Sequence, residues 1–148
     1  MRVVIDTNIL IGGADDESSI AYKIIEEVIA GRLDAYATHQ TMGENRQMLR
    51  KLVRDRNYRE RLEEFFRNLK IVKVFKPLYV VADEEDNKLF ESAASSGAEY
   101  LISQDREVLD LEEYHGTRVV TPQDFWAIYK SDKGGSAWSD WSKMIMGS

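Results

Sequence analysis

Residues 3–10 read VVIDTNIL, in which a run of mostly β-branched residues gives way to polar side chains. The stretch Arg2–Ile5 predicts a strand that is buried on both faces of a parallel sheet. Asp6 follows this strand directly, and Thr7 and Asn8 come next. Side chains at the carboxyl ends of parallel strands converge on a ligand crevice. We therefore expect Asp6 to lie in a binding site.

Strands and helices alternate along the rest of the chain. Short apolar runs predict strands over residues 33–38, 71–75, 100–103 and 118–121. Helical spacing of apolar residues predicts helices over residues 18–30, 41–70 with a break near 55–57, 83–97, and from Pro122 through Tyr129. This alternation predicts an α/β fold whose parallel sheet is covered by helices on both faces.

One domain over residues 1–130 is the expectation for a chain of 148 residues. The composition changes after Lys130, where residues 131–136 are polar and contain two glycines. Residues 131–148 are therefore predicted to form a separate tail. Trp138, Trp141 and Ile145 have helical spacing there and predict a short helix that docks on the domain or on a partner.

The formal net charge of −6 argues against indiscriminate binding of nucleic acids. Basic residues are nevertheless concentrated in residues 46–70, which contain nine Lys or Arg and four Asp or Glu. Arg46, Arg50 and Arg54 recur every four residues, so they form one helical ridge that can contact phosphates. An ordinary solvated helix face explains the same pattern equally well.

The sequence has no cysteine, no apolar run of the length that crosses a membrane, and no secretory signal at its start. A cytoplasmic location without membrane association is the expectation.

Three further carboxylates occupy positions where an acidic residue is unfavourable. Asp105 follows the predicted strand over residues 100–103, so it is expected at the same sheet edge as Asp6. Glu44 precedes Met48 by four residues and continues a stripe that includes Leu52, which predicts that it points toward the core.

Asp86 lies three residues before Leu89 and four before Phe90, again on the apolar side of a predicted helix. Four converging carboxylates need a counter-charge in a partly desolvated pocket. Oxygen ligands suit Mg²⁺ or Mn²⁺, and such ions activate water and stabilise a leaving oxygen in phosphodiester hydrolysis. Each acid alone is also explained as a loop residue, a helix cap or a first-turn acid.

The ordered motifs resemble those of PIN-domain nucleases. VVIDTNIL is similar to the first motif, and THQTMGE at residues 38–44 is similar to the second. DEEDNKLFESAASSGAEYLISQDREVL at residues 83–109 resembles the third and fourth. GTRVVTPQDFW at residues 116–126 is similar to the end of the subgroup of VapC-like toxins of toxin–antitoxin pairs. The resemblance spans about residues 1–130.

The resemblance implies a three-layer α/β/α sandwich and Mg²⁺- or Mn²⁺-dependent cleavage of single-stranded RNA. It assigns metal-binding and catalytic roles to four acids and supporting roles to three polar groups: Asp6, Glu44, Asp86 and Asp105, and Thr7, Asn8 and Ser103. It also implies an antitoxin protein as partner. The tail lies outside it and is a candidate for covering a sheet edge, for a homodimer contact or for antitoxin binding.

Several alternatives remain open from the sequence. A non-catalytic PIN-like module would bind RNA or a protein, and a DNA-directed nuclease would use the same chemistry. A phosphohydrolase with Asp6 as nucleophile is less well supported, because Asn8 stands where that pattern needs a second Asp. His39 and His115 are expected to be structural or surface residues, and the pair Gly12–Gly13 to be a loop rather than a phosphate grip.

Overall fold

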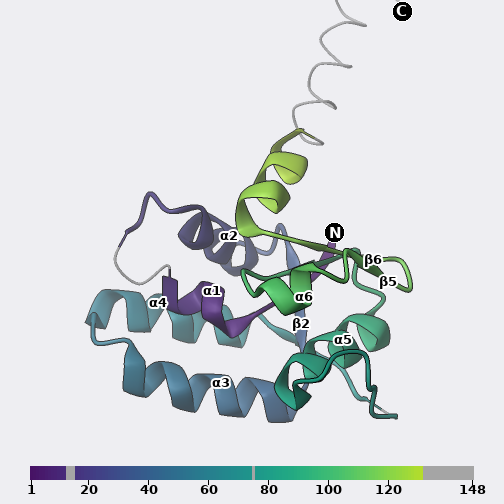
Figure 1. The fold of residues 1–148 in the computed structure, drawn as a ribbon. Helices are drawn as coiled ribbons and strands as arrows, with labels where there is room; N and C mark the ends of the chain where they lie inside the picture. The colour runs from purple at the N-terminus through teal and green to yellow at the C-terminus, as the bar shows by residue number, and fades with distance from the viewer. Residues whose placement is uncertain (13–15, 75, 132–148) are drawn as a thin grey trace, which may run out of the picture.

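The computed structural model describes residues 1–12, 16–74 and 76–131. Figure 1 shows the alternation of strands and helices along the chain. The elements, in chain order, are β1 (Arg2–Ile5), α1 (Thr7–Gly12), α2 (Ile20–Ile29), β2 (Asp34–Ala37), α3 (His39–Leu52), α4 (Arg56–Arg67), β3 (Lys70–Ile71), α5 (Glu84–Ser96), β4 (Tyr100–Ile102), α6 (Arg106–Leu109), β5 (Glu113–Tyr114) and β6 (Thr117–Val120). A further helix runs over residues 122–131.

The strands form one sheet in the order β3-β2-β1-β4-β6-β5. Neighbouring strands are parallel except β5, which pairs antiparallel with β6. β1 lies inside the sheet, with Val3 opposite Ala35 of β2 and Val4 opposite Leu101 of β4. The predicted α/β fold with a mostly parallel sheet is confirmed, whereas the antiparallel edge formed by β5 was not predicted.

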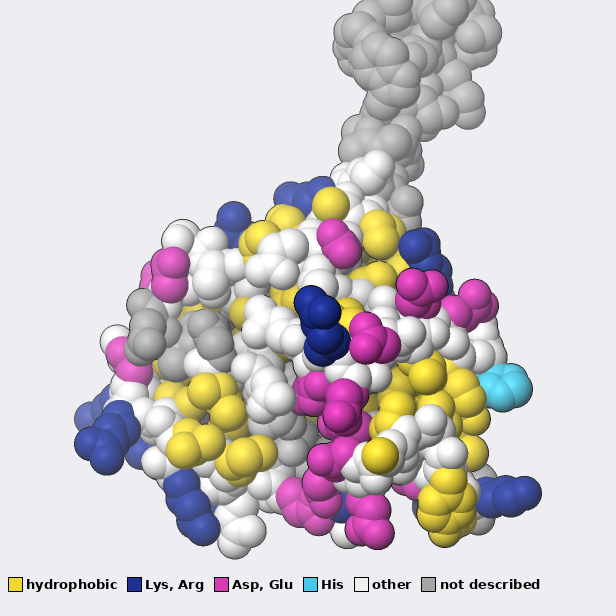
Figure 2. All heavy atoms as spheres, in the orientation of Figure 1, with side chains coloured by type: hydrophobic (Ala, Val, Ile, Leu, Met, Phe, Trp, Pro, Cys, Tyr) yellow, Lys and Arg dark blue, Asp and Glu magenta, His cyan; other side chains and the backbone are white. Residues whose placement is uncertain are grey.

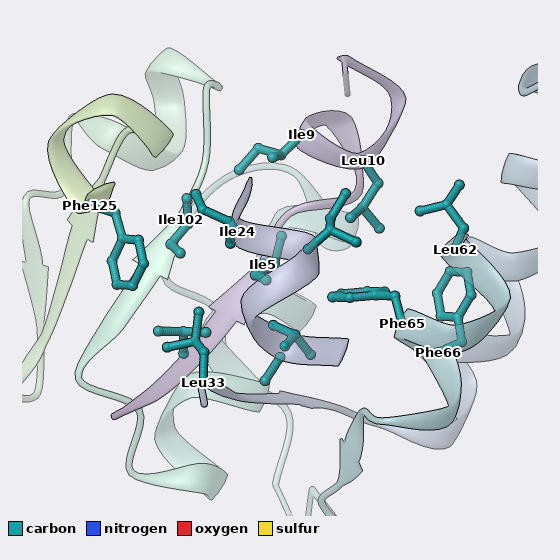
Figure 3. Packing of buried hydrophobic residues seen from close by; sticks show 14 of the residues in the cluster. Ile5, Ile9, Leu10, Ile24, Leu33, Leu62, Phe65, Phe66, Ile102 and Phe125 are labelled. Carbon is teal, nitrogen blue, oxygen red and sulfur yellow. The ribbon is translucent and has the colours of Figure 1, made fainter. Parts of the chain in front are cut away.

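Side chains of β1 alternate between the two faces of the sheet. Val3 and Ile5 belong to the apolar cluster that includes α2, α4 and the helix over residues 122–131. Val4 belongs to a second cluster, formed with α5 and α6. Figure 3 shows side chains of the first cluster, among them Phe65 from α4 and Ile24 from α2. Helices therefore cover both faces, which gives the three layers expected of this fold.

Capping residues fix where the helices begin. Ser19 accepts a hydrogen bond from the Tyr22 N–H at the start of α2, and Asp55 accepts one from the Tyr58 N–H at the start of α4. The predicted break between α3 and α4 is confirmed at this point. Asp83 caps α5, at the start of the helix predicted over residues 83–97, and Gly97 ends that helix with φ of 66°. The ends of α5 are therefore set by side-chain chemistry local to the sequence.

No helix was predicted directly after Asp6, and the pair Gly12–Gly13 was expected to be a loop. α1 begins at Thr7, and Ile9 and Leu10 within it are 1% and 2% exposed. Burial of these apolar side chains stabilises a helix too short to form alone. Gly12 ends α1, and Gly13 lies outside the described residues.

The strand predicted over residues 71–75 is β3, which is limited to Lys70–Ile71. Phe75, at the end of that predicted strand, lies outside the described residues. The predicted helix over Trp138, Trp141 and Ile145 also lies outside them. None of the helices in the described part of the chain combines the length and apolar character that a bilayer crossing requires.

Candidate active site at the carboxyl end of the sheet

Asp6 lies directly after β1 and is 7% exposed. Its backbone N–H donates to the Ile102 carbonyl at 2.9 Å, which fixes it beside the end of β4. The Ser103 hydroxyl donates to Asp6 Oδ2 at 2.8 Å, and the Asn8 backbone N–H donates to Oδ1 at 3.3 Å. Burial raises the pKa of Asp6, and the charge of Asp105 raises it further, whereas the two hydrogen bonds lower it. The carboxylate is thus held in place in an environment that disfavours its charge.

The side chain of Ser103 connects Asp6 to Asp105. Ser103 is fully buried, and its hydroxyl oxygen accepts a hydrogen bond from the Asp105 N–H at 3.0 Å while it donates to Asp6. The predicted supporting position of Ser103 is therefore adjacent to both acids. Thr7 is buried beside Asp6, and Asn8 is exposed and contacts Asp6 through its backbone.

Asp86 lies in the first turn of α5 and is half-buried. The pKa of Asp86 is raised to about 6, mainly by burial and then by the charges of Asp105, Asp83, Asp6 and Glu107, in that order. Each of these charges disfavours the ionised form of Asp86. Figure 2 shows Asp and Glu side chains in a band down the middle of this face, where Figure 1 has α6 above and the start of α5 below.

Two of these neighbours also have capping roles. Asp83 Oδ1 accepts from the Glu85 N–H at 2.8 Å and from the Asp86 N–H at 3.3 Å. Asp105 Oδ1 accepts from the Glu107 N–H at 3.0 Å at the start of α6. One oxygen of each carboxylate therefore serves its own helix.

Glu44 is placed differently from the other three predicted acids. The prediction that it continues a core-facing stripe is wrong, because Met48 and Leu52 on that stripe are 39% and 56% exposed. The residue of α3 that is buried is Leu49, one position further on. Glu44 is exposed at the rim, and its charge is not among those that raise the pKa of Asp86.

Glu44 instead contacts Lys88 of α5, whose Nζ lies 3.3 Å from Glu44 Oε2. Lys88 also forms an ion pair with Glu85 at 3.0 Å. Lys88 was not among the site residues predicted from the sequence. Its only local signal is the spacing of three residues from Glu85 and two from Asp86, because Glu44 is 44 residues away.

The acids do not form a ready ligand set for a metal ion. Within residues 1–12, 16–74 and 76–131, no three His, Cys, Asp or Glu side chains are grouped closely enough to hold one. The chemistry of the donors nevertheless fits a hard divalent cation, because Asp6, Asp86 and Asp105 offer carboxylate oxygens and no soft ligand. Burial is the largest cause of the raised pKa of both Asp6 and Asp86, and neighbouring carboxylates raise each pKa further.

The predicted arginine ridge borders a groove of about 580 Å³ between α3 and α4. Arg46 and Arg50 both form ion pairs with Glu63, and Arg46 also lies over the Phe66 ring at 5.8 Å. Arg46 Nε is buried without a hydrogen-bond partner among the described residues. Arg54 follows α3 and is exposed. Arg46 and Arg50 therefore lie on α3 as predicted, whereas the prediction that Arg54 continues their helical ridge is wrong, because α3 ends at Leu52 and Val53 is extended. Glu63 neutralises part of the charge of Arg46 and Arg50.

Comparison with known proteins places the chain in a family. No curated protein matches the sequence. A solved structure, the crystal structure of PAE2754 from Pyrobaculum aerophilum, is similar with 22% sequence identity and a TM-score of 0.47, over 80% of this chain and 92% of that chain. A family model described as the PIN domain matches residues 2–107, which is most of the chain. The protein therefore belongs to the PIN domain family.

Proposed function

We propose that the protein is an endoribonuclease that uses Mg²⁺ or Mn²⁺ to hydrolyse phosphodiester bonds of single-stranded RNA. PIN domain proteins are generally nucleases, so membership of the family supports this class of reaction. The observation that carries the proposal is the buried Asp6 carboxylate at the end of β1, which the buried Ser103 hydroxyl connects to Asp105. The pKa of Asp86, raised to about 6 by burial and by the charges of Asp105, Asp83, Asp6 and Glu107, supports the same region. Such an unfavourable grouping of charges is typical of functional sites rather than of structural ion pairs.

Four carboxylates are proposed as the metal-binding and catalytic residues: Asp6, Glu44, Asp86 and Asp105. A divalent cation at this position would make a water acidic enough to attack phosphorus and would stabilise the charge on the leaving oxygen. The protein's own contribution is to orient Asp6. Hydrogen bonds from Ser103 to Oδ2 and from Asn8 to Oδ1 hold both oxygens of Asp6 in place, which reduces the reorganisation that the reaction requires.

The proposed path of the RNA runs along the arginine ridge. Arg50 is 58% exposed at its side chain, and Arg54 is exposed as well, so both can reach phosphates. Arg46 is proposed as a third contact, although its guanidinium already binds Glu63. The selection of RNA over DNA rests on the resemblance of the motifs to RNA-cleaving relatives.

A role as the toxin of a toxin–antitoxin pair, with an antitoxin as partner and a homodimer as the oligomeric state, is a finer proposal. It rests on the similarity of residues 116–126 to VapC-like toxins. Expression of the protein in growing cells is expected to arrest growth, and expression of the Asp6→Asn variant is not.

The test of the proposed reaction is incubation of the purified full chain with labelled single-stranded RNA and Mn²⁺. We expect discrete products from the wild type, and none from Asp6→Asn or in the presence of a chelator. The matched control is Glu84→Gln, which removes an exposed carboxylate of α5 that does not contribute to the pKa of Asp86. A labelled single-stranded DNA of the same sequence distinguishes RNA from DNA cleavage.

Two other results of this experiment would contradict the proposed reaction or its site. RNA retention without products under any divalent metal would favour the non-catalytic binding module. Products that persist at full rate with Asp6→Asn would show that cleavage does not depend on the carboxyl end of β1.

A further inference from the structure

Lys88 is a cation within the acidic region, and it joins the two helices that carry Glu44 and Asp86. Its Nζ lies 3.4 Å and 3.3 Å from the two carboxylate oxygens of Glu44 in α3. The same Nζ lies 3.0 Å from Glu85 Oε1 in α5. The Lys88 side chain is 24% exposed, so most of its surface is covered by the protein.

Glu44 depends on this contact more than Asp6 and Asp105 depend on any one of theirs. Asp6 is held by a fully buried hydroxyl and by a backbone N–H, and Asp105 accepts from a backbone N–H. Glu44 is 44% exposed at its side chain, and its other hydrogen bond comes from the Gln40 amide at 3.2 Å, on its own exposed helix. A flexible, exposed glutamate has many accessible rotamers, and an ion pair to a covered lysine restricts them.

We propose that Lys88 is a positioning residue of the nuclease site, which orients the Glu44 carboxylate toward the helix that carries Asp86. This inference rests on the proposed function, because it gives Lys88 a role only if Glu44 serves the metal site. The alternative is an ordinary surface ion pair between α3 and α5. Such a pair would contribute about 0–1 kcal/mol to stability and nothing to the binding of a metal.

The test measures Mn²⁺ affinity by isothermal titration calorimetry together with RNA cleavage, on the full chain. Lys88→Met removes the ammonium and keeps most of the apolar length, and Lys88→Arg retains a cation. Glu85→Gln is the matched control, because it removes the other partner of Lys88 without touching Glu44. Circular dichroism and thermal unfolding of each variant establish that it is folded.

We expect Lys88→Met to weaken Mn²⁺ binding and cleavage by roughly tenfold, as loss of groups that orient metal ligands does. Lys88→Arg should restore most of both, and Glu85→Gln should leave both nearly unchanged. In the background of Glu44→Gln, Lys88→Met should have no additional effect, since two residues that act through one contact are not additive.

The outcomes separate the inference from the proposed function. If the wild type neither binds Mn²⁺ nor cleaves RNA, the proposed function and the inference both fall. If the wild type does both and Lys88→Met binds Mn²⁺ as well as or better than the wild type, only the inference is overturned. An equal loss from Lys88→Met with and without Glu44 would also overturn it.

Discussion

Two regions of the molecule are similarly buried but differ in polarity. The side chains between the sheet and helices α2 and α4 are apolar, whereas those at the carboxyl ends of β1 and β4 are polar. Phe65 and Ile24 are 2% and 0% exposed, and Asp6 and Ser103 are 7% and 0% exposed. Burial of each apolar side chain stabilises the fold by about 1.5–3 kcal/mol. Burial of Asp6 instead raises its pKa and opposes its charge. Similar burial therefore stabilises the fold at Phe65 and Ile24 and destabilises the charged form of Asp6. The region around Asp6 is the one that we propose acts on RNA.

The largest expected effect on the polar region comes from Asp6→Asn. The amide keeps an acceptor for the Ser103 hydroxyl but carries no charge for a metal, so we expect cleavage to fall by roughly three orders of magnitude, since a bound metal contributes several kcal/mol to catalysis. The thermal midpoint without metal should stay the same or rise. A loss of activity accompanied by unfolding would instead make Asp6 a structural residue like Phe65.

On the apolar side, Phe65→Ala is expected to lower the free energy of unfolding by about 3–5 kcal/mol, because it leaves a cavity in a filled core. Urea unfolding followed by circular dichroism measures this. Tyr79→Ala is the control, since Tyr79 is 88% exposed and its removal should change stability by no more than about 0.5 kcal/mol. Similar losses of unfolding free energy from Phe65→Ala and Tyr79→Ala would contradict the assignment of Phe65 to the apolar core.

Ser103→Ala tests the link between the two acids. Loss of its hydroxyl removes the donor to Asp6 and the acceptor of the Asp105 N–H, so cleavage should fall by roughly 10–100-fold. Initial rates at saturating Mn²⁺ measure the change. Ser95→Ala, at an exposed position of α5, should retain full activity. Wild-type rates from Ser103→Ala would show that Asp6 needs no orientation by the hydroxyl.

The pH dependence of stability gives a smaller effect. The pKa of Asp86 is about 6 in the folded chain and 3.8 for an unperturbed carboxyl, so the folded state binds more protons between these values. The contribution of Asp86 to stability is therefore greatest below pH 3.8 and is lost as the pH rises through about 6. Without metal, the difference in unfolding free energy between Asp86→Asn and the wild type should increase by about 1 kcal/mol across this window. A constant difference would contradict the raised pKa.

The smallest expected effect is that of Asp55→Ala, which removes the cap of α4 at a distance from the acids. Loss of the hydrogen bond to the Tyr58 N–H should lower the free energy of unfolding by about 1 kcal/mol. Asp55→Asn keeps an acceptor and should lower it by less. Cleavage rates should be unchanged in both, and a reduced rate would place α4 closer to the reaction than proposed.

Much of the fold could be predicted because the signals are local. Apolar runs located β1, β2, β4 and β6, and capping residues such as Asp83 located helix ends. Two elements were not found. α1 exists because Ile9 and Leu10 are buried against residues distant in the sequence. β5 pairs with the adjacent β6, but its two residues are too few to show a strand pattern.

For the site residues, too, the predictions differ according to whether the sequence signal is local. Asp6 and Asp105 were correctly expected at neighbouring strand ends, since a parallel sheet brings such ends together. The predicted orientation of Glu44 was wrong, because helical spacing alone does not show whether the Met48 face or the Leu49 face of α3 is buried. The contact of Lys88 with Glu44 depends on how α3 and α5 are placed by the fold, and no short-range pattern in the sequence encodes it.

The two outermost strands of the described sheet, β3 and β5, have two residues each. The exposed edge of β3 begins with Lys70, which is paired with Asp34 of β2 at 3.1 Å. Short strands and a charged lysine discourage a neighbouring molecule from extending a sheet by backbone pairing. Growth of the sheet from copy to copy by backbone pairing at these edges is therefore disfavoured, which lowers the tendency of the folded molecule to assemble into fibres.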